Sequence, residues 1–214
     1  MACVPKLPRS AFVKICGVTN VDDATSAVKS GANAIGLNFA DSPRRITLEQ
    51  ARDIVDATRG QILHCAVFRS GDDAFILDTV TELEVEMVQL HDAISDDLLS
   101  RLRQRDLIVV KALNIDDAEL DEFNEVRVDA VLVDGPRPGS GELHSWDRLL
   151  ARPFQVPVIL AGGLNPDNVA DVIALTNAWG VDSASGVESS PRHKDHELVQ
   201  SFVVNARQMF GQKE

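Results

Sequence analysis

The two residues best suited to chemistry are Cys16 and Asp134, because each ends an apolar, strand-like segment. A thiolate can remove a proton and a carboxylic acid can donate one, so together they can serve one substrate as general base and general acid. Lys14 precedes Cys16 by two residues, which places both side chains on the same face of an extended strand. There its ammonium group would favour the thiolate. The alternative is a cysteine that only packs and an aspartate that only caps a turn.

Two glycine-bearing loops form a second chemical feature. Gly162 and Gly163 follow the apolar run VPVILA, and Ser185 and Gly186 follow GVDSA. Glycine lets the backbone approach an anion closely, and the N–H groups at the start of a helix are good anion donors. We therefore expect these four residues to bind a phosphate group. Glycines that only form tight turns are the alternative.

Other polar residues also follow strand-like runs. Arg44 and Arg45 lie in the segment SPRR, where one arginine could hold a carboxylate through two hydrogen bonds. Gln89 and His91 are two residues apart and so share a face at the end of VEMVQL, and Asp182 lies in WGVDSA. We expect Arg44, Gln89, His91 and Asp182 to face a substrate, although most arginines are plain surface charges.

Eight apolar runs have the composition of β-strands. Several are continuously apolar rather than alternating, as expected for strands covered on both faces. They are FVKIC (12–16), AIGLNF (34–39), ILHCAVF (62–68), VEMVQL (85–90), LIVVKAL (107–113), AVLVD (130–134), VPVILA (156–161) and WGVDSA (179–184).

Amphipathic stretches with helix signals lie between most of these runs. Thr47 with Gln50 three residues later forms a capping-box pattern, and Pro166 after Asn165 is typical of a first helical turn. The residues His-Lys-Asp-His at 193–196 indicate a solvated start of the last helix. The predicted helices cover residues 21–31, 47–60, 95–104, 165–175 and 195–210, with shorter ones around 116–124 and 145–151.

Strands that alternate with helices predict parallel β-α-β units. Eight such units in 214 residues predict an α/β protein with a single (β/α)8 TIM-barrel domain over residues 1–214, in which residues 1–10 form a flexible tail. An open doubly wound sheet is the alternative, but it more commonly has five or six strands. In a (β/α)8 barrel the carboxyl ends of the strands carry the active site. Cys16 and Asp134 would then face a substrate from opposite sides of one mouth.

Composition excludes several classes of function. The chain has 21 basic and 33 acidic residues, a net charge of −12, which argues against binding to nucleic acid or an anionic membrane. Three cysteines without a C-x-x-C pair do not predict a disulfide framework or a zinc site, and a cytoplasmic protein is expected. No dinucleotide fingerprint follows the first strand, and no P-loop motif occurs.

Longer motifs show a family resemblance. The sequence resembles phosphoribosylanthranilate isomerase of tryptophan biosynthesis over nearly its whole length. In chain order, the motifs that carry this resemblance are VKICGVTNVDDA (13–24), SGANAIGLNF (30–39), SPRRIT (42–47), VQLHD (88–92), VKAL (110–113), LVDG (132–135), GSGE (139–142), ILAGGLNPDNV (159–169), GVDSASGVE (180–188) and KDHELV (194–199).

The resemblance implies a (β/α)8 enzyme without metal or organic cofactor. Its implied reaction is the Amadori rearrangement of a small phosphoribosyl substrate, N-(5'-phosphoribosyl)anthranilate, to a 1-deoxyribulose 5-phosphate ketone. By position Cys16 matches the family's general base, Asp134 its general acid and Arg44 the arginine that contacts the substrate carboxylate. The glycine-rich loops and Gly141 match its phosphate site. These roles lead us to expect a raised pKa for Asp134 and a lowered pKa for Cys16.

The sequence also departs from the family pattern. The stretch from Gly36 to the SPR motif is one residue shorter than in relatives, so spacing alone aligns Arg45 with the clamping arginine. The loop at 135–142 is altered as well, which leaves the substrate preference open. Alternatives are an aminoimidazole-carboxamide ribotide isomerase, a dual-substrate isomerase, or a phosphosugar-binding barrel without activity. The sequence allows a monomer or a homodimer.

Overall fold

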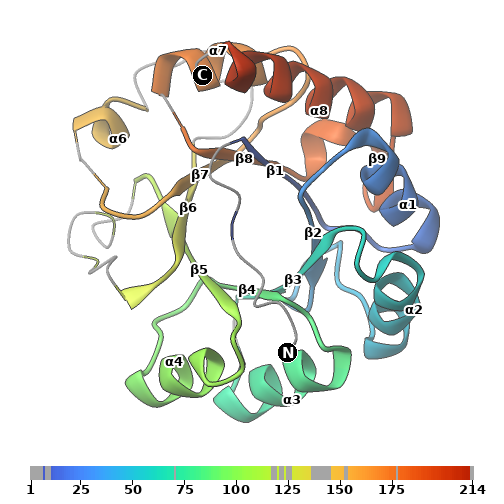
Figure 1. Cartoon of the computed structure of the whole chain (residues 1–214), viewed down its shortest axis with the longest axis vertical. Coiled ribbons are helices and arrows are strands. Elements are labelled where there is room, and N and C mark those ends of the chain that lie inside the picture. Colours follow the sequence, from blue (N-terminus) through green and yellow to red (C-terminus); the bar gives the residue numbers. More distant parts are fainter. Residues whose placement is uncertain are drawn as a thin grey trace.

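Eight parallel strands close into a ring in sequence order. The computed structural model describes residues 7, 11–69, 71–116, 120, 123, 127–135, 146–151, 154–176 and 178–212. Neighbouring strands pair in parallel all the way round, and β8 pairs with β1 to close the barrel (Figure 1). The strands are β1 Phe12–Cys16, β2 Ala34–Asn38, β3 Leu63–Phe68, β4 Met87–Leu90, β5 Ile108–Asn114, β6 Ala130–Asp134, β7 Val158–Ala161 and β8 Gly180–Ser183. The predicted (β/α)8 barrel is confirmed, and the open sheet is wrong.

Helices surround the ring of strands on the outside (Figure 1). Those described are α1 Val21–Ser30, α2 Leu48–Thr58, α3 Asp73–Leu83, α4 Asp96–Arg103, α6 Asp147–Ala151, α7 Val169–Thr176 and α8 His196–Gly211. Helix α3 was not among the predicted helices, although Asp72 caps it and Ile76, Val80 and Leu83 form its buried face. The helix expected around 116–124 lies mostly outside the described residues, as do residues 1–10 apart from Leu7.

Local side-chain hydrogen bonds begin several helices. At α2 the capping box is complete, because Thr47 Oγ1 accepts from the Gln50 backbone N–H and the Gln50 side chain accepts from the Thr47 N–H. Helix α7 was predicted, but it begins three residues later than the expected first helical residue, Pro166. Asn165 Oδ1 accepts from the backbone N–H of Asp167, so residues 166–168 form a turn and the helix begins only at Val169.

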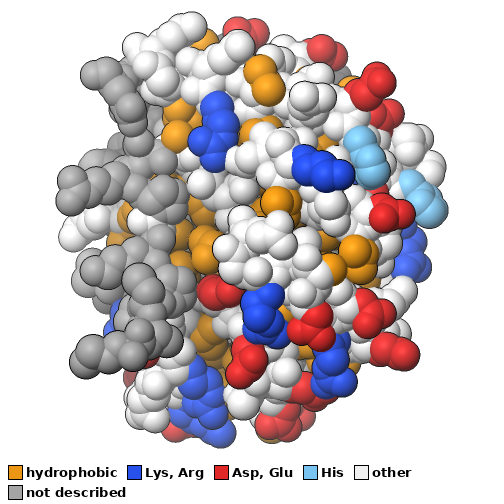
Figure 2. Space-filling view, turned by 45° about the vertical axis from the view of Figure 1, so that its right-hand side comes forward, with side chains coloured by type: hydrophobic (Ala, Val, Ile, Leu, Met, Phe, Trp, Pro, Cys, Tyr) orange, Lys and Arg blue, Asp and Glu red, His pale blue; other side chains and the backbone are white. Residues whose placement is uncertain are grey.

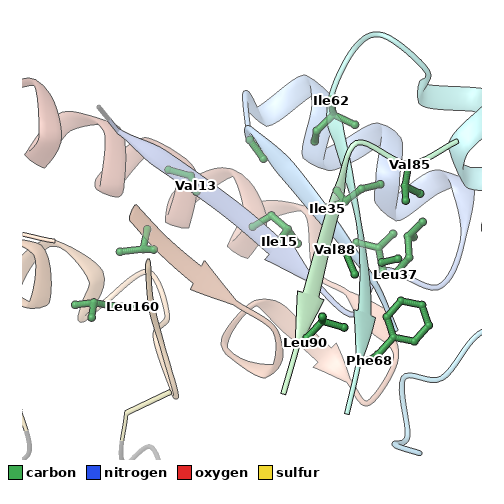
Figure 3. Close-up of a cluster of buried hydrophobic side chains, with 14 of the residues drawn as sticks. Val13, Ile15, Ile35, Leu37, Ile62, Phe68, Val85, Val88, Leu90 and Leu160 are labelled. Atoms are coloured by element: carbon green, nitrogen blue, oxygen red, sulfur yellow. The ribbon is translucent and has the colours of Figure 1, made fainter. Parts of the chain in front are cut away.

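Alternation along the strands separates two apolar layers. Val13 and Ile15 point outward and lie beside Ile35 and Leu37 of β2 in the layer under the helices (Figure 3). The residues between them in the sequence point into the barrel, which is filled by a second cluster. That interior cluster comprises Phe12, Ala34, Cys65, Val67, Met87, Ile108, Val110, Ala112, Ala130, Leu132, Ile159 and Ala161. Cys16 packs against the upper end of this cluster.

A short hairpin that the sequence analysis did not predict follows β8. The 3-10 helix η3 (Ser185–Val187) leads into β9 (Glu188–Ser190), which pairs antiparallel with β10 (His193–Lys194). The expectation of a solvated helix start at residues 193–196 is therefore wrong for Lys194, whose side chain is fully buried. His196 does begin α8, and its Nε2 lies 3.0 Å from Asp23 Oδ1.

Charged side chains of both signs are scattered over one face of the molecule (Figure 2). Figure 2 shows acidic and basic residues interspersed on one face, with hydrophobic side chains in small groups between them. Within the described part of the chain, none of the helices has both the length and the apolar character needed to cross a membrane.

Candidate active site

A cavity of about 580 Å³ opens at the carboxyl ends of the barrel strands. Its lining draws on the carboxyl-terminal parts of all eight barrel strands and on the loops that follow most of them. Ten of the predicted site residues line it: Cys16, Arg44, Gln89, His91, Asp134, Gly162, Gly163, Asp182, Ser185 and Gly186. The eleventh, Gly141, lies outside the described residues. The tertiary structure therefore brings together residues up to 170 positions apart.

Cys16 stands at the border between the packed interior and the cavity. It is partly exposed, and β1 pairs it in register with Gly36 of β2. A Cβ atom at position 36 would lie 2.6 Å from Cys16 Sγ, so the thiol occupies the space left by the absent side chain of Gly36. Burial raises the pKa of Cys16, and the nearby ammonium of Lys14 opposes this only in part. The expected lowering of the thiol pKa is therefore wrong for this structure.

Lys14 lies one layer below Cys16 on the same inward face. Its Nζ is 3.0 Å from Oδ1 of Asp182, and the two residues are register partners in β1 and β8. Burial is the largest single effect and would lower the pKa of Lys14, but the charge of Asp182, with the nearby Cys16 and Cys65 and the hydrogen bond to Asp182, together raise that pKa. Lys14 is thus a permanent buried cation beside the thiol.

Asp134 ends β6 and faces the same cavity. β7 and β8 separate β6 from β1 in the ring, so Asp134 and Cys16 lie on two well-separated strands that end at the same mouth. Its Oδ1 would lie 2.8 Å from a Cβ atom at Gly162, which places the carboxyl directly against that glycine. Burial, followed by the charge of Asp182, raises the pKa of Asp134, which is the direction that the sequence analysis predicted.

Gln89 and His91 present a paired amide and imidazole. Gln89 Nε2 lies 3.0 Å from His91 Nε2. Burial, together with the charges of Arg69, Lys14 and Lys111, lowers the pKa of His91 to about 4, so the ring is neutral at pH 7 and can accept from the amide. Gln89 Oε1 is buried and has no hydrogen-bond partner in the described part of the structure. Gln89 therefore lines the cavity with one hydrogen-bond acceptor that no described residue uses.

The two arginines of the SPRR segment have different surroundings. Arg44 lines the cavity, whereas Arg45 is exposed and does not contribute to the lining. Arg44 packs over Gly17, where an added Cβ atom would lie 2.4 Å from Arg44 Cδ. Its Nε and Nη2 donate to the two carboxylate oxygens of Glu188, at 2.7 and 2.6 Å.

The glycine-rich loops lie side by side at the same mouth. Gly162 and Gly163 have φ angles of +92° and +71°, in the region that favours glycine. Ser183 Oγ donates to the backbone oxygen of Leu164 over 2.6 Å, which ties the end of β8 to the loop after β7. A Cβ atom at Gly186 would lie 2.0 Å from that same oxygen, so only glycine allows the two loops to approach this closely.

Comparison with known proteins decides which barrel family this site belongs to. The family model of N-(5'-phosphoribosyl)anthranilate (PRA) isomerase matches residues 13–205. The chain belongs to this isomerase family. A family member from Geotalea uraniireducens is 38% identical over 201 residues, which make up 91% of this chain and 98% of the relative.

Solved structures of PRA isomerases have the same fold as this chain and match it over most of its length. The Thermotoga maritima enzyme superposes with a TM-score of 0.82 at 34% identity, covering 92% of this chain and 99% of that one. Another PRA isomerase structure, with a TM-score of 0.76, 34% identity and coverage of 92% and 99%, holds reduced 1-(o-carboxyphenylamino)-1-deoxyribulose 5-phosphate. The barrel is therefore that of the PRA isomerase family.

Sequence reasoning missed several residues of this PRA isomerase cavity. Arg69, directly after β3, and Asn114, at the end of β5, both line it. Their position at a strand end was a usable signal, the same one that identified Asp134. Glu188, which contacts Arg44 from outside the cavity lining, carried no such signal, because this contact depends on the unpredicted β9–β10 hairpin. Among the described residues, no cluster of three or more His, Cys, Asp and Glu side chains could hold a metal ion.

Proposed function

We propose that this isomerase converts N-(5'-phosphoribosyl)anthranilate into its 1-deoxyribulose 5-phosphate ketone with Cys16 as general base and Asp134 as general acid. The observation that carries the proposal is that both side chains line one cavity, whose wall also includes the glycine loops at 162–163 and 185–186. Membership of the PRA isomerase family supplies the reaction class.

The chemistry follows from the two groups. Asp134 donates its proton to the ring oxygen of the ribose, the bond from that oxygen to C1 breaks, and the nitrogen lone pair forms an iminium with C1. The iminium withdraws electrons from C2, so the Cys16 thiolate can remove the C2 proton. The resulting enolamine gains a proton at C1 and loses the one on its C2 hydroxyl, which leaves the ketone. No atom is added or lost, and no external oxidant is needed.

The binding roles rest on charge and position. Gly162, Gly163, Ser185 and Gly186 would hold the phosphate through backbone N–H groups, together with Gly141 from outside the described residues. Arg44 would bind the substrate carboxylate, and the free Oε1 of Gln89 would accept from a ligand N–H or O–H. The molecule held by the solved relative bears a carboxylate and a phosphate, in agreement with these two anion sites.

The predicted partner is this small phosphoribosyl substrate. A solved Thermotoga maritima PRA isomerase is described as dimeric, and for this chain we propose a monomer or a homodimer in the cytoplasm. Light scattering of the purified protein distinguishes the two states.

One assay tests the proposed function. Purified protein is mixed with freshly made N-(5'-phosphoribosyl)anthranilate, and the loss of substrate fluorescence is followed against the spontaneous rate. We expect an enzyme-dependent loss proportional to protein concentration. No loss above the spontaneous rate would reject the proposal. In a parallel assay with the aminoimidazole-carboxamide ribotide substrate, turnover of both substrates would identify a dual-substrate enzyme, and turnover of the ribotide alone would identify a ribotide isomerase.

A further inference from the structure

Arg44, Glu188 and Lys194 form a chain of ion pairs at the edge of the cavity. The Glu188 carboxylate accepts from Arg44 Nε and Nη2 at 2.7 and 2.6 Å and from Lys194 Nζ at 3.0 Å. Its side chain is only 4% exposed, and that of Lys194 is fully buried. Of the three, Arg44 alone lines the cavity.

The backbone holds Glu188 rigidly in this place. Glu188 and Lys194 are register partners across the β9–β10 hairpin, and Lys194 Nζ also donates to the backbone oxygen of Ala184 at 2.8 Å. On the other side, the aliphatic part of Arg44 passes over Gly17, next to Cys16. The Arg44 guanidinium is therefore held in place at both ends. Because its conformational entropy is already lost in the free protein, substrate binding does not have to order this side chain.

The geometry of the ion pair leaves one edge of the guanidinium unused by Glu188. A guanidinium has a side edge, formed by Nε and one Nη, and an end edge, formed by the two Nη atoms. Glu188 takes the side edge through Nε and Nη2. The N–H groups of the end edge can still form two parallel bonds to a second carboxylate.

We propose that Glu188, supported by Lys194, is a positioning residue that fixes Arg44 so that the end edge of its guanidinium binds the carboxylate of the substrate. This inference rests on the proposed function and extends it to residues outside the catalytic pair. This role of Glu188 also explains why a buried carboxylate lies beside a site for anions. Glu188 neutralises one positive charge there, but it holds the Arg44 guanidinium in the orientation that binds the substrate.

A competing role for Glu188 makes the opposite prediction. If Glu188 only occupied Arg44 until substrate displaced it, then Glu188→Gln would remove a competitor and leave two uncompensated cations, Arg44 and Lys194. Electrostatic attraction would increase, and KM for the substrate would fall. If Glu188 positions Arg44, KM rises despite the extra positive charge.

The test compares two substrates in Glu188→Gln. The first is N-(5'-phosphoribosyl)anthranilate, and the second is N-(5'-phosphoribosyl)aniline, which lacks only the carboxylate. We expect KM for the first to rise by about tenfold or more, because a charged hydrogen-bonded contact is weakened. For the aniline substrate kcat/KM should stay close to that of the unmodified enzyme. An equal loss with both substrates, or a lower KM with the first, would overturn the proposal.

Two further variants keep the test decisive. Glu82→Gln is the matched control, because Glu82 forms an exposed ion pair with Arg52 away from the cavity. This variant should leave KM and kcat/KM unchanged for both substrates. Should Glu188→Gln fail to fold, Arg44→Lys replaces it. An ammonium that pairs with Glu188 has no second planar edge, so KM should rise for the carboxylate substrate only, and an unchanged KM would contradict the inference. If the unmodified enzyme itself turns over neither substrate, the proposed function fails, which is a separate outcome.

Discussion

Lys14 and Asp182 form an ion pair inside the barrel, at the seam where the last strand meets the first. Lys14 Nζ lies 3.0 Å from Asp182 Oδ1, and the side chains are 1% and 8% exposed. The pair lies directly below Cys16, in the layer that separates the apolar interior from the cavity. Burying one of these charges without its partner lowers the free energy of unfolding, so the ammonium and the carboxylate can be buried here only as a pair.

Breaking this pair should destabilise the barrel strongly. Lys14→Met leaves the Asp182 carboxylate buried without its partner, and we expect the free energy of unfolding to fall by about 3–5 kcal/mol. Urea denaturation followed by circular dichroism measures the loss. In Lys14→Met/Asp182→Leu neither charge remains, so the double variant should be more stable than the sum of the single variants implies. Strict additivity of the two effects would show that the residues do not interact.

The two proposed catalytic groups should be separately essential. Cys16→Ala removes the base and Asp134→Asn removes the acid, and each should lower kcat by about 10²–10⁴-fold while the protein stays folded. Cys65→Ala is the matched control. Cys65 is fully buried, and burial raises its pKa to about 12, so its removal should affect stability but not the proton transfer step. Near-normal turnover in either active-site variant would remove that residue from the mechanism.

The pH dependence of kcat/KM should have two limbs. The active form needs a protonated Asp134 and a deprotonated Cys16, whose pKa values are raised above their ordinary 3.8 and 9.0. Below the pKa of Asp134 the rate rises with pH, because the thiolate fraction increases. Between the pKa of Asp134 and the pKa of Cys16 the rate stays level, because the increase in thiolate is cancelled by the decrease in protonated Asp134. Above the pKa of Cys16 the thiolate is complete, and the rate falls.

Asp134→Asn provides the internal check of that profile. Without a titrating acid, the residual rate should rise with pH up to the pKa of the thiol and then stay level. Stopped-flow assays across the alkaline range measure this limb. A fall in rate at high pH that persists in Asp134→Asn would assign the alkaline limb to some group other than the acid.

The phosphate loops should be sensitive to a single methyl group. In Gly186→Ala the new Cβ atom would lie 2.0 Å from the Leu164 backbone oxygen, so the loops after β7 and β8 must separate. We expect the inhibition constant of inorganic phosphate to rise by about tenfold or more, since charged hydrogen bonds are lost. The KM for N-(5'-phosphoribosyl)anthranilate should rise together with this inhibition constant, because the substrate also bears a phosphate.

A glycine without such a contact serves as the control. Gly211, the last residue of α8, has no atom within 4 Å of an added Cβ, so Gly211→Ala should leave phosphate inhibition unchanged. Equal phosphate inhibition in Gly186→Ala and the unmodified enzyme would place the phosphate elsewhere in the cavity.

Local sequence patterns were enough to predict the barrel and ten of the residues that line its cavity. Continuously apolar runs of strand length indicated strands covered on both faces, and their number and spacing indicated the closed ring. Because parallel strands in such a ring all end at one mouth, the position of a residue at a strand end was enough to group Cys16, Gln89, Asp134 and Asp182. Strand length, apolar character and position at a strand end are local properties of the chain, so they can be recognised from short stretches of sequence.

The interactions between these groups could not be predicted from the sequence, because they depend on the folded arrangement of the chain. The pKa of Cys16 is raised because burial outweighs the charge of Lys14, a balance of opposing long-range effects that spacing cannot reveal. Likewise Arg44 and Glu188 are 144 residues apart and meet through a hairpin without a strong local signal. Desolvation and ion pairing depend on which segments lie together in space, and that is settled only when the chain has closed into its barrel.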